Sequence, residues 1–362
     1  MTSTSEHIPG SAGVSPASPP EYDRALARAE AGERLERREI ASLIGCAAGQ
    51  ERLLAAADRV RQRALGPAVH LRALVEFSNH CRQDCWYCGL RAGNATLPRY
   101  RMPPHEIVDT ALAASRLGYG TCVLQSGEDP AYDAQAVAGI VRAIKTESDL
   151  ALTLSVGERP EADYAAWREA GADRYLLKIE TTDPALFARL RPGRTLQQRV
   201  ACLQALGRLG YQVGSGFMVG LPAQSLDSLA GDLAFLRDLP CHMAGIGPFI
   251  PHPQTPLAGE PSGDLDLVLR CLAVARLLLP PAHLAATTAS ATLHPQGRQR
   301  ALAAGADVIM PNVTPEHYRV HYEIYPGKIA PRGDMPSYRR QIEALIVGEG
   351  RTVGQGRGDY GG

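Results

Sequence analysis

The segment LRALVEFSNHCRQDCWYC, residues 71–88, joins a short apolar run to a loop that carries three cysteines. Leu71–Phe77 has the length and the β-branched, apolar composition of a buried strand. Cys81, Cys85 and Cys88 follow within a few residues in the spacing C-x3-C-x2-C, which lets three thiolates converge from one short loop. Both the fold and the function of the chain are predicted from this segment outward.

Similar apolar runs recur along the chain, and most are followed by a longer stretch with helical periodicity. The predicted strands are Leu71–Phe77, Thr121–Ser126, Leu150–Val156, Arg174–Ile179, Gln212–Val219, Met243–Phe249, His283–Thr288 and Asp307–Met310. Eight strands that alternate with helices predict parallel pairing through right-handed crossovers. We therefore expect an α/β fold, a (βα)8 barrel of TIM type. An open doubly wound sheet is the alternative, although no G-x-G-x-x-G follows any predicted strand.

The rest of the chain is predicted to form extensions of this barrel. Residues 1–20 are rich in Ser, Pro and Gly and form a flexible tail, because they cannot bury enough apolar surface to order themselves. Residues 21–66 form an N-terminal helical extension that we expect to cap the bottom of the barrel. Residues 67–330 form the barrel, and residues 331–362 form a C-terminal extension without cysteines.

Composition excludes several classes of protein. The chain has 38 Lys and Arg against 38 Asp and Glu, and this neutral balance argues against a nucleic-acid partner. No apolar run approaches the roughly 20 residues of a membrane span, and the N-terminus lacks the features of a secretory signal. Five of the eight cysteines are scattered singly in apolar segments, whereas three lie together. This distribution predicts a cytoplasmic protein with one metal site and no membrane partner.

Polar residues follow most of the predicted strands. In a barrel the carboxyl ends of the strands meet at one mouth, where active sites are found. The residues at these positions are Ser78-Asn79, Ser126–Asp129, Gly157-Glu158, Glu180–Thr182, Pro251-His252, Thr287-Thr288 and Asn312. The strands themselves carry few charges, so the arrangement predicts an enzyme.

The cysteine loop favours an iron–sulfur cluster over other metal sites. Four-iron clusters normally take four Cys ligands, and three ligands leave one iron open to bind another molecule. A structural zinc site is the first alternative, but it requires a fourth Cys or His, and His80 is too close in sequence to complete a tetrahedron. Three cysteines that are neighbours by coincidence are the second alternative.

The spacing, with the aromatic Tyr87 before the third cysteine, resembles the radical S-adenosylmethionine (SAM) superfamily. Six longer strings within residues 50–330 resemble the HydE family of FeFe-hydrogenase maturases: EFSNHCRQDCWYCGLRAGN, LQSGEDP, ADRYLLKIET, GIGPFIPHPQTPLA, ATTA and VIMPNVTPEHYRVHYEIYPGKI. Biotin synthase and methylornithine synthase share the barrel and the cluster loop but match the later strings less well. A radical SAM enzyme of small-molecule biosynthesis is therefore the alternative function, and a zinc-binding barrel hydrolase is a third.

The resemblance implies two cofactors, SAM and one 4Fe–4S cluster held by Cys81, Cys85 and Cys88. In this superfamily the methionine end of SAM chelates the open iron, and an electron from an external donor cleaves the sulfonium to give a 5′-deoxyadenosyl radical. The family resemblance further implies a role in assembling the diiron subcluster of the hydrogenase active site. It implies a small organometallic iron substrate supplied by HydG, and a product that passes to HydF.

The resemblance also suggests roles for individual side chains. The expected SAM-binding residues are Tyr87, Gln125, Ser126, Gly127, Glu128, Lys178, Glu180, Arg199, Met243 and Tyr322. The expected substrate-binding residues are Arg72, Thr287, Thr288 and Tyr325. Lys178 replaces an arginine of some relatives and lacks its bidentate fork. Met243 serves equally well as plain core packing.

Two features refine these roles. Arg72 is a charge within a predicted strand, and an isolated buried cation is costly unless it is paired, which favours an anionic partner. An arginine that points outward into solvent is the alternative.

Some relatives carry further cysteines near the C-terminus for a second cluster, but here no Cys follows Cys271, so we expect one cluster only.

Overall fold

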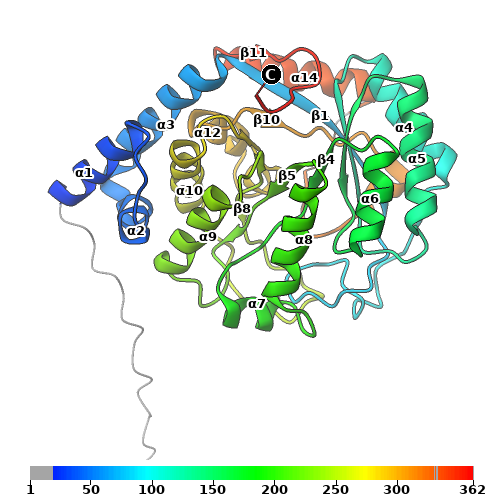
Figure 1. Ribbon diagram of the computed structural model, residues 1–362, viewed down its shortest axis with the longest axis horizontal. Helices are drawn as coiled ribbons and strands as arrows, with labels where there is room; N and C mark the ends of the chain where they lie inside the picture. The colour runs from blue at the N-terminus through cyan, green and yellow to red at the C-terminus, as the bar shows by residue number, and fades with distance from the viewer. Residues whose placement is uncertain (1–18, 330, 332, 362) are drawn as a thin grey trace, which may run out of the picture.

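The computed structural model describes residues 19–329, 331 and 333–361, so the predicted tail lies almost wholly outside the described residues. A parallel sheet follows chain order through eight strands and curls into a barrel (Figure 1). The strands are β1 Ala68–Ser78, β2 Thr121–Ser126, β3 Ala151–Ser155, β4 Arg174–Leu176, β5 Gln212–Ser215, β7 Met243–Ala244, β9 His283–Leu284 and β10 Val308–Ile309. The end strands meet through a bridge between Ala285 and Val308 and a 3.0 Å bond from Asp307 N to Leu284 O. The predicted barrel is confirmed.

Two predicted strands are each interrupted by a break. Gln212–Val219 divides into β5 and β6 (Met218–Val219), and Met243–Phe249 divides into β7 and β8 (Gly247–Pro248). The breaks fall where the two segments cross. A side chain at Gly216, whose φ is +152°, would collide with the backbone of Gly245. β6 and β8 then pair with each other at the mouth of the barrel.

Helices surround the sheet on its outer face (Figure 1). They are α4 Pro104–Arg116, α5 Ala134–Glu147, α6 Glu161–Glu169, α7 Pro184–Leu190, α8 Leu196–Arg208, α9 Leu226–Asp238, α10 Leu265–Leu278, α11 Thr288–Leu293, α12 Gly297–Ala303, α13 Glu316–Arg319 and α14 Met335–Gly348. Several begin at residues that cap the first turn, such as Asp133 before α5 and Thr195 before α8. Because side chains alternate along a strand, Val75 and Phe77 join the core beneath the helices, and Arg72 and Glu76 point into the barrel.

The N-terminal extension consists of α1 Pro19–Glu30, α2 Arg37–Gly45 and α3 Gln50–Leu65. These helices lie on the side of the barrel against α9 and α10, not at its bottom, so the expected cap is wrong (Figure 1). Their apolar faces, with Ile40, Leu43 and Leu53 fully buried, complete the core around α9 and α10. The helices in the described part of the chain are all too short or too polar to cross a bilayer.

The C-terminal extension closes the bottom of the barrel instead. After α14, strand β11 (Thr352–Val353) pairs in parallel with Ala68 and Val69 at the start of β1. The chain then crosses the open end, where Arg357 O accepts a 2.7 Å hydrogen bond from Thr121 Oγ1 at the start of β2. The C-terminal extension therefore occupies the end of the barrel that the N-terminal helices were expected to cover.

Candidate active site

The cysteine loop is anchored where β1 ends. Asn79 donates from Nδ2 to Pro98 O at 2.8 Å and to His321 O at 2.7 Å, and it accepts from Tyr100 N at 2.7 Å. Arg99 donates to four backbone carbonyls, those of Asn79, Leu90, Arg91 and Asn94. A long loop whose polar groups are satisfied in this way is a rigid platform for its three thiols.

The three thiols lie together in a dry environment. Cys85 is buried, and Cys81 and Cys88 are half-buried. Burial raises the pKa of Cys81 to about 11 and raises the pKa of Cys88 further, with Cys85 and Cys81 beside it adding to the shift. Thiols of this kind give up their protons only to a strongly bound cation, as metal coordination requires.

The donor set fits a 4Fe–4S cluster with one open iron. Three thiols of one loop are available, and four-iron clusters are held by Cys thiolates. Cys122 faces the helices in the outer core and cannot supply a fourth ligand.

Gly127 allows the loop after β2 to lie against the cysteine loop. A Cβ atom at Gly127 would lie 2.8 Å from Cys81 Cβ and still closer to His80 O. Glu128 N donates to Cys81 Sγ at 3.4 Å, and Ser126 Oγ donates to Gly127 O at 2.7 Å. The predicted Ser-Gly-Glu segment therefore touches the cysteine loop directly.

Two buried carboxylates and two buried guanidinium groups stand beside the cysteines. Arg199 Nε lies 2.6 Å from Glu158 Oε1, and Arg199 Nη1 donates to Lys178 O at 2.9 Å. Arg191 Nη2 lies 3.7 Å from Glu128 Oε1 and 3.5 Å from Glu158 Oε1. Nη2 of each arginine and Nε of Arg191 are buried and lack a hydrogen-bond partner within the described structure. Such donors suit a bound carboxylate.

Arg191 and Glu158 were not among the predicted site residues, although Glu158 follows a predicted strand. Arg191 ends helix α7, and its Nη1 donates to the hydroxyl of Tyr87 at 3.4 Å. Tyr87 itself packs against the small apolar cluster of Leu186, Leu190, Leu221, Phe249 and Leu257. Asp183-Pro184 is a typical helix start and follows the fourth strand directly, so the sequence indicates a short helix at the mouth, and Arg191 lies at the end of that helix.

Glu180 has a strained backbone next to Lys178. Its φ of +67° lies in the left-handed region, which costs a non-glycine residue about 1 kcal/mol or more. Lys178 Nζ is 3.1 Å from Glu180 Oε2, yet this oxygen is buried without a well-aligned hydrogen bond. Strain of this kind is concentrated at functional sites.

The final segment before α14 covers the mouth. Ile324 O accepts a 3.0 Å bond from Gly89 N, so the segment touches the cysteine loop. Tyr322 is buried next to Gln125, and burial raises the pKa of Tyr325 and of Tyr322. Lys328 forms an ion pair with the buried Glu76 of β1, which fixes the segment to the barrel interior.

Arg72 lies inside the barrel, so the outward-pointing alternative is wrong. Its Nη1 is 2.7 Å from Met243 Sδ, its Nη2 donates to Gly358 O at 3.2 Å, and its Nε has no partner among the described residues. Burial, with Arg174 beside it, lowers the pKa of Arg72 to about 9. A cavity of about 30 Å³, lined in part by Arg72, Thr153, Met243 and His283, adjoins it. Met243 therefore lies in the lower interior with Arg72, away from Tyr87.

The two threonines after β9, Thr287 and Thr288, form hydrogen bonds within the first turns of helix α11. Thr287 caps α11, where its hydroxyl accepts from Ser290 N at 3.3 Å. Thr288 O accepts from Thr292 Oγ1 at 3.0 Å, and both threonines are half-buried. Both follow strand β9 at the start of α11, and each retains capacity for a further hydrogen bond.

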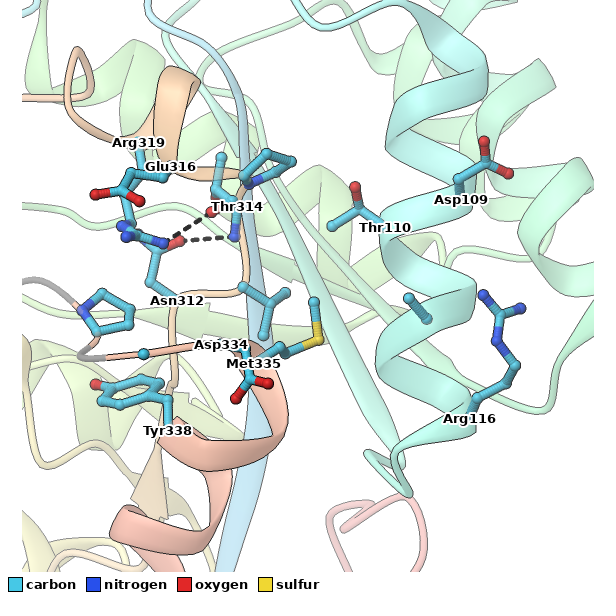
Figure 2. A pocket seen from close by; sticks show the side chains of 15 residues that line it. Asp109, Thr110, Arg116, Asn312, Thr314, Glu316, Arg319, Asp334, Met335 and Tyr338 are labelled. Carbon is cyan, nitrogen blue, oxygen red and sulfur yellow. Dashed lines mark hydrogen bonds between the residues drawn. The ribbon is translucent and has the colours of Figure 1, made fainter.

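A separate pocket of about 570 Å³ lies outside the barrel (Figure 2). Asp109, Thr110 and Arg116 of α4 form one wall, and Asn312, Thr314, Arg319 and Tyr338 line the other. Arg319 Nη1 donates to Thr314 O at 3.0 Å, and Asn312 Oδ1 accepts from Thr314 N at 3.0 Å. β1 separates this pocket from the barrel interior, so it is not part of the site described above.

Known proteins resemble both the sequence and the fold. The sequence profile of the Radical SAM superfamily matches residues 75–236. The FeFe-hydrogenase maturase subunit HydE of Thermotoga maritima is 48% identical over 333 residues, which cover 89% of this chain and 95% of that protein. The 3-methylornithine synthase of Methanosarcina barkeri is 28% identical over 300 residues, covering 82% and 85% of the two chains. The crystal structure of methylornithine synthase (PylB) has a TM-score of 0.80 at 26% identity, covering 91% and 97%.

These matches confirm the predicted family, the enzyme class and the cofactors, because radical SAM enzymes use a 4Fe–4S cluster and SAM. The chain belongs to the radical SAM superfamily and, within it, to the family of the FeFe-hydrogenase maturase subunit HydE.

Proposed function

We propose that the protein binds SAM at the barrel mouth and acts on a small anionic iron complex held inside the barrel. The observation that carries the proposal is the pair of buried arginines, Arg191 and Arg199, whose unpartnered N–H groups lie beside the cysteine loop. Glu158 and Glu128 balance part of this charge, and the carboxylate of SAM would accept hydrogen bonds from the buried N–H groups that are left without a partner. HydE-type maturation of a hydrogenase active site is the function that fits this site and the family.

Cys81, Cys85 and Cys88 would hold the 4Fe–4S cluster, with one iron left for the methionine end of SAM. When bound and reduced by an external electron donor, the cluster supplies the electron that cleaves the sulfonium and generates a 5′-deoxyadenosyl radical. The protein contributes the rigid loop and the surrounding dry cavity. Exclusion of water protects a reactive radical from side reactions.

The neighbouring side chains would orient SAM. Arg199 and Arg191 would bind its carboxylate, and Glu128 with the Gly127 carbonyl would accept hydrogen bonds from its ammonium group. Tyr87 would pack near the adenine, and Glu180 Oε2, which lies 3.1 Å from Lys178 Nζ without a well-aligned hydrogen bond, would accept one from the ribose. The remaining proposed SAM contacts are Gln125, Ser126, Lys178 and Tyr322, whereas Met243, which contacts Arg72 in the lower interior, is no longer proposed as one.

The interior below this layer would bind the substrate. Arg72 is a cation without a carboxylate partner in the described structure, and it faces a cavity with the unpartnered hydroxyl of Thr153. The cavity at Arg72, of about 30 Å³, has room for one small group only, so a cysteine-bound iron carbonyl cyanide complex, supplied by HydG, would present a single anionic group to Arg72 from above. Thr287, Thr288 and Tyr325 would bind its upper part, and the product would pass to HydF. We place the enzyme in the cytoplasm, where these maturases would meet.

Anaerobic reconstitution tests the proposal. The expected result is a brown protein that forms 5′-deoxyadenosine from SAM with a reductant and supports activation of an apo-hydrogenase together with HydG and HydF. Cys85→Ser should lose both activities, and Cys122→Ser, outside the site, is the matched control. Formation of 3-methylornithine, or zinc binding without SAM cleavage, would assign the chain to one of the alternative functions.

A further inference from the structure

The C-terminal strap, residues 351–360, is built into the bottom of the barrel. Thr352 N donates to Pro67 O at 3.1 Å and Gly354 N donates to Val69 O at 2.8 Å, which continues the sheet beside β1. Figure 1 shows the C-terminus beside β11, the strand that pairs with β1. The strap is therefore a fixed part of the fold and covers the end opposite the cysteine loop.

The strap supplies the acceptors for two buried cations. Arg174 is fully buried, and its Nη2 donates to Arg357 O at 2.8 Å, to Gly358 O at 3.0 Å and to Asp359 Oδ1 at 2.6 Å. Gly358 O also accepts from Arg72 Nη2 at 3.2 Å. Among the described residues, Asp359 is the one carboxylate paired with Arg174, and none is paired with Arg72.

The fit of the strap is tight. Gly358 has a φ of +55°, and a Cβ atom there would lie 2.7 Å from Nδ1 of His70. The His70 ring stands edge-on to His283 at 5.3 Å, and Nδ1 of His283 lies 2.6 Å from Asp307. Asp359 is held from two further sides, by Gln212 Nε2 at 3.1 Å and by Arg357 Nε at 2.9 Å.

We infer that the strap is the floor of the barrel interior beneath the substrate and that Asp359 is a positioning residue for Arg72. Asp359 fixes Arg174 and the Gly358 carbonyl, and the Gly358 carbonyl in turn orients the Arg72 guanidinium toward the cavity. The strap also keeps water out of the barrel interior from below, as radical chemistry requires. The inference rests on the proposed function in one respect, that Arg72 binds the substrate.

Native trypsin digestion of the full, reconstituted protein tests the strap. The Arg357–Gly358 bond is a tryptic site whose carbonyl is held by Thr121 and Arg174, so the wild type should resist cleavage there. Asp359→Asn removes a charge-assisted contact, and the C-terminal peptide should be released about 10-fold faster or more. Asp359→Glu keeps the charge and should restore part of the protection. Asp23→Asn, which breaks the exposed pair with Arg52, is the matched control and should be cleaved like the wild type.

A second measurement separates positioning from general stability. For Asp359→Asn, the concentration of the iron carbonyl cyanide complex that half-saturates 5′-deoxyadenosine formation should rise about 10-fold, the loss expected for weakening one charged contact. The affinity for SAM should not change, because SAM binds at the opposite end of the barrel. Unchanged trypsin sensitivity, unchanged half-saturation, or a parallel loss of SAM affinity would each overturn the inference.

Hydrogen exchange of the wild type provides a check that needs no variant. The amides of Thr352, Gly354 and Tyr360 donate hydrogen bonds to fixed acceptors and should exchange as slowly as those of β1. Fast exchange would show that the strap is not a floor. If the wild type formed no 5′-deoxyadenosine at all, the proposed function would fail, and trypsin and exchange would still decide whether the strap is built as described.

Discussion

Gly127→Ala tests whether the cluster loop tolerates any displacement. Gly127 is absent from the residues with positive φ, so its backbone accepts alanine and the effect comes from contacts alone. The new Cβ would lie 2.8 Å from Cys81 Cβ, whereas ordinary contacts begin at 3.4 Å, so Cys81 must move by about 0.6 Å. The carbonyl of His80, which is closer still, must move further.

A shift of this size matters because metal–ligand distances tolerate deviations of only about 0.2 Å. Overpacking of this kind costs about 1–3 kcal/mol of unfolding free energy, which leaves the protein folded. The chemistry should suffer more, since a displacement of about 1 Å costs about 100-fold in rate. We therefore expect a folded variant with less bound iron and 5′-deoxyadenosine formation slowed about 100-fold.

The assay compares Gly127→Ala with Gly139→Ala in helix α5, where an added Cβ meets nothing within 4 Å. Gly139→Ala should stabilise the helix by about 0.5–1 kcal/mol and leave the activity unchanged. Iron content, urea unfolding and 5′-deoxyadenosine are measured on both variants. The reasoning is refuted if Gly127→Ala binds as much iron and cleaves SAM within twofold of Gly139→Ala.

Three further predictions concern other parts of the molecule. Reconstituted protein should bind about four irons per chain, and clearly more iron at a second protein site would contradict the single cluster. Lys328→Met leaves Glu76 buried without its cation and should lower the unfolding free energy by about 3–5 kcal/mol in urea titrations; a change below 1 kcal/mol would mean that the pair is unimportant. Burial raises the pKa of Asp232 to about 7, although hydrogen bonds from Thr182 and Thr181 oppose the shift. The unfolded chain releases this proton near pH 4, whereas the folded protein keeps it up to about pH 7. The stabilising contribution of the protonated carboxyl is therefore complete below about pH 4 and is lost as the pH rises through 7. Asp232→Asn should remove this fall in stability between pH 4 and 8, and urea curves that keep the same pH dependence would count against it.

Much of the fold was predictable because its signals are local. The alternation of apolar runs with helical periods places each strand and helix, and the spacing of Cys81, Cys85 and Cys88 places a cluster loop directly after the first strand. Capping residues such as Asp133 and Thr195 mark where helices begin. These features depend on neighbours a few residues apart, which a sequence displays directly.

The candidate site was predictable where it follows the strands and not elsewhere. Ser126, Gly127 and Glu128 lie against the cysteine loop as expected, because parallel strands bring their carboxyl ends to one mouth. Arg191 was missed because it ends a short helix, and only packing brings its guanidinium to Tyr87 and Glu158. No periodicity predicts that contact.

By itself, the sequence determined the strand and helix order, the cysteine loop and the radical SAM family. Only the tertiary structure decided what closes the bottom of the barrel and what surrounds Arg72. The sequence showed a charge within a strand, and the structure pairs it with Met243 and with Gly358, 286 positions further along the chain. Contacts over such separations depend on how the whole sheet curls, because closing the barrel brings distant backbone and side chains together.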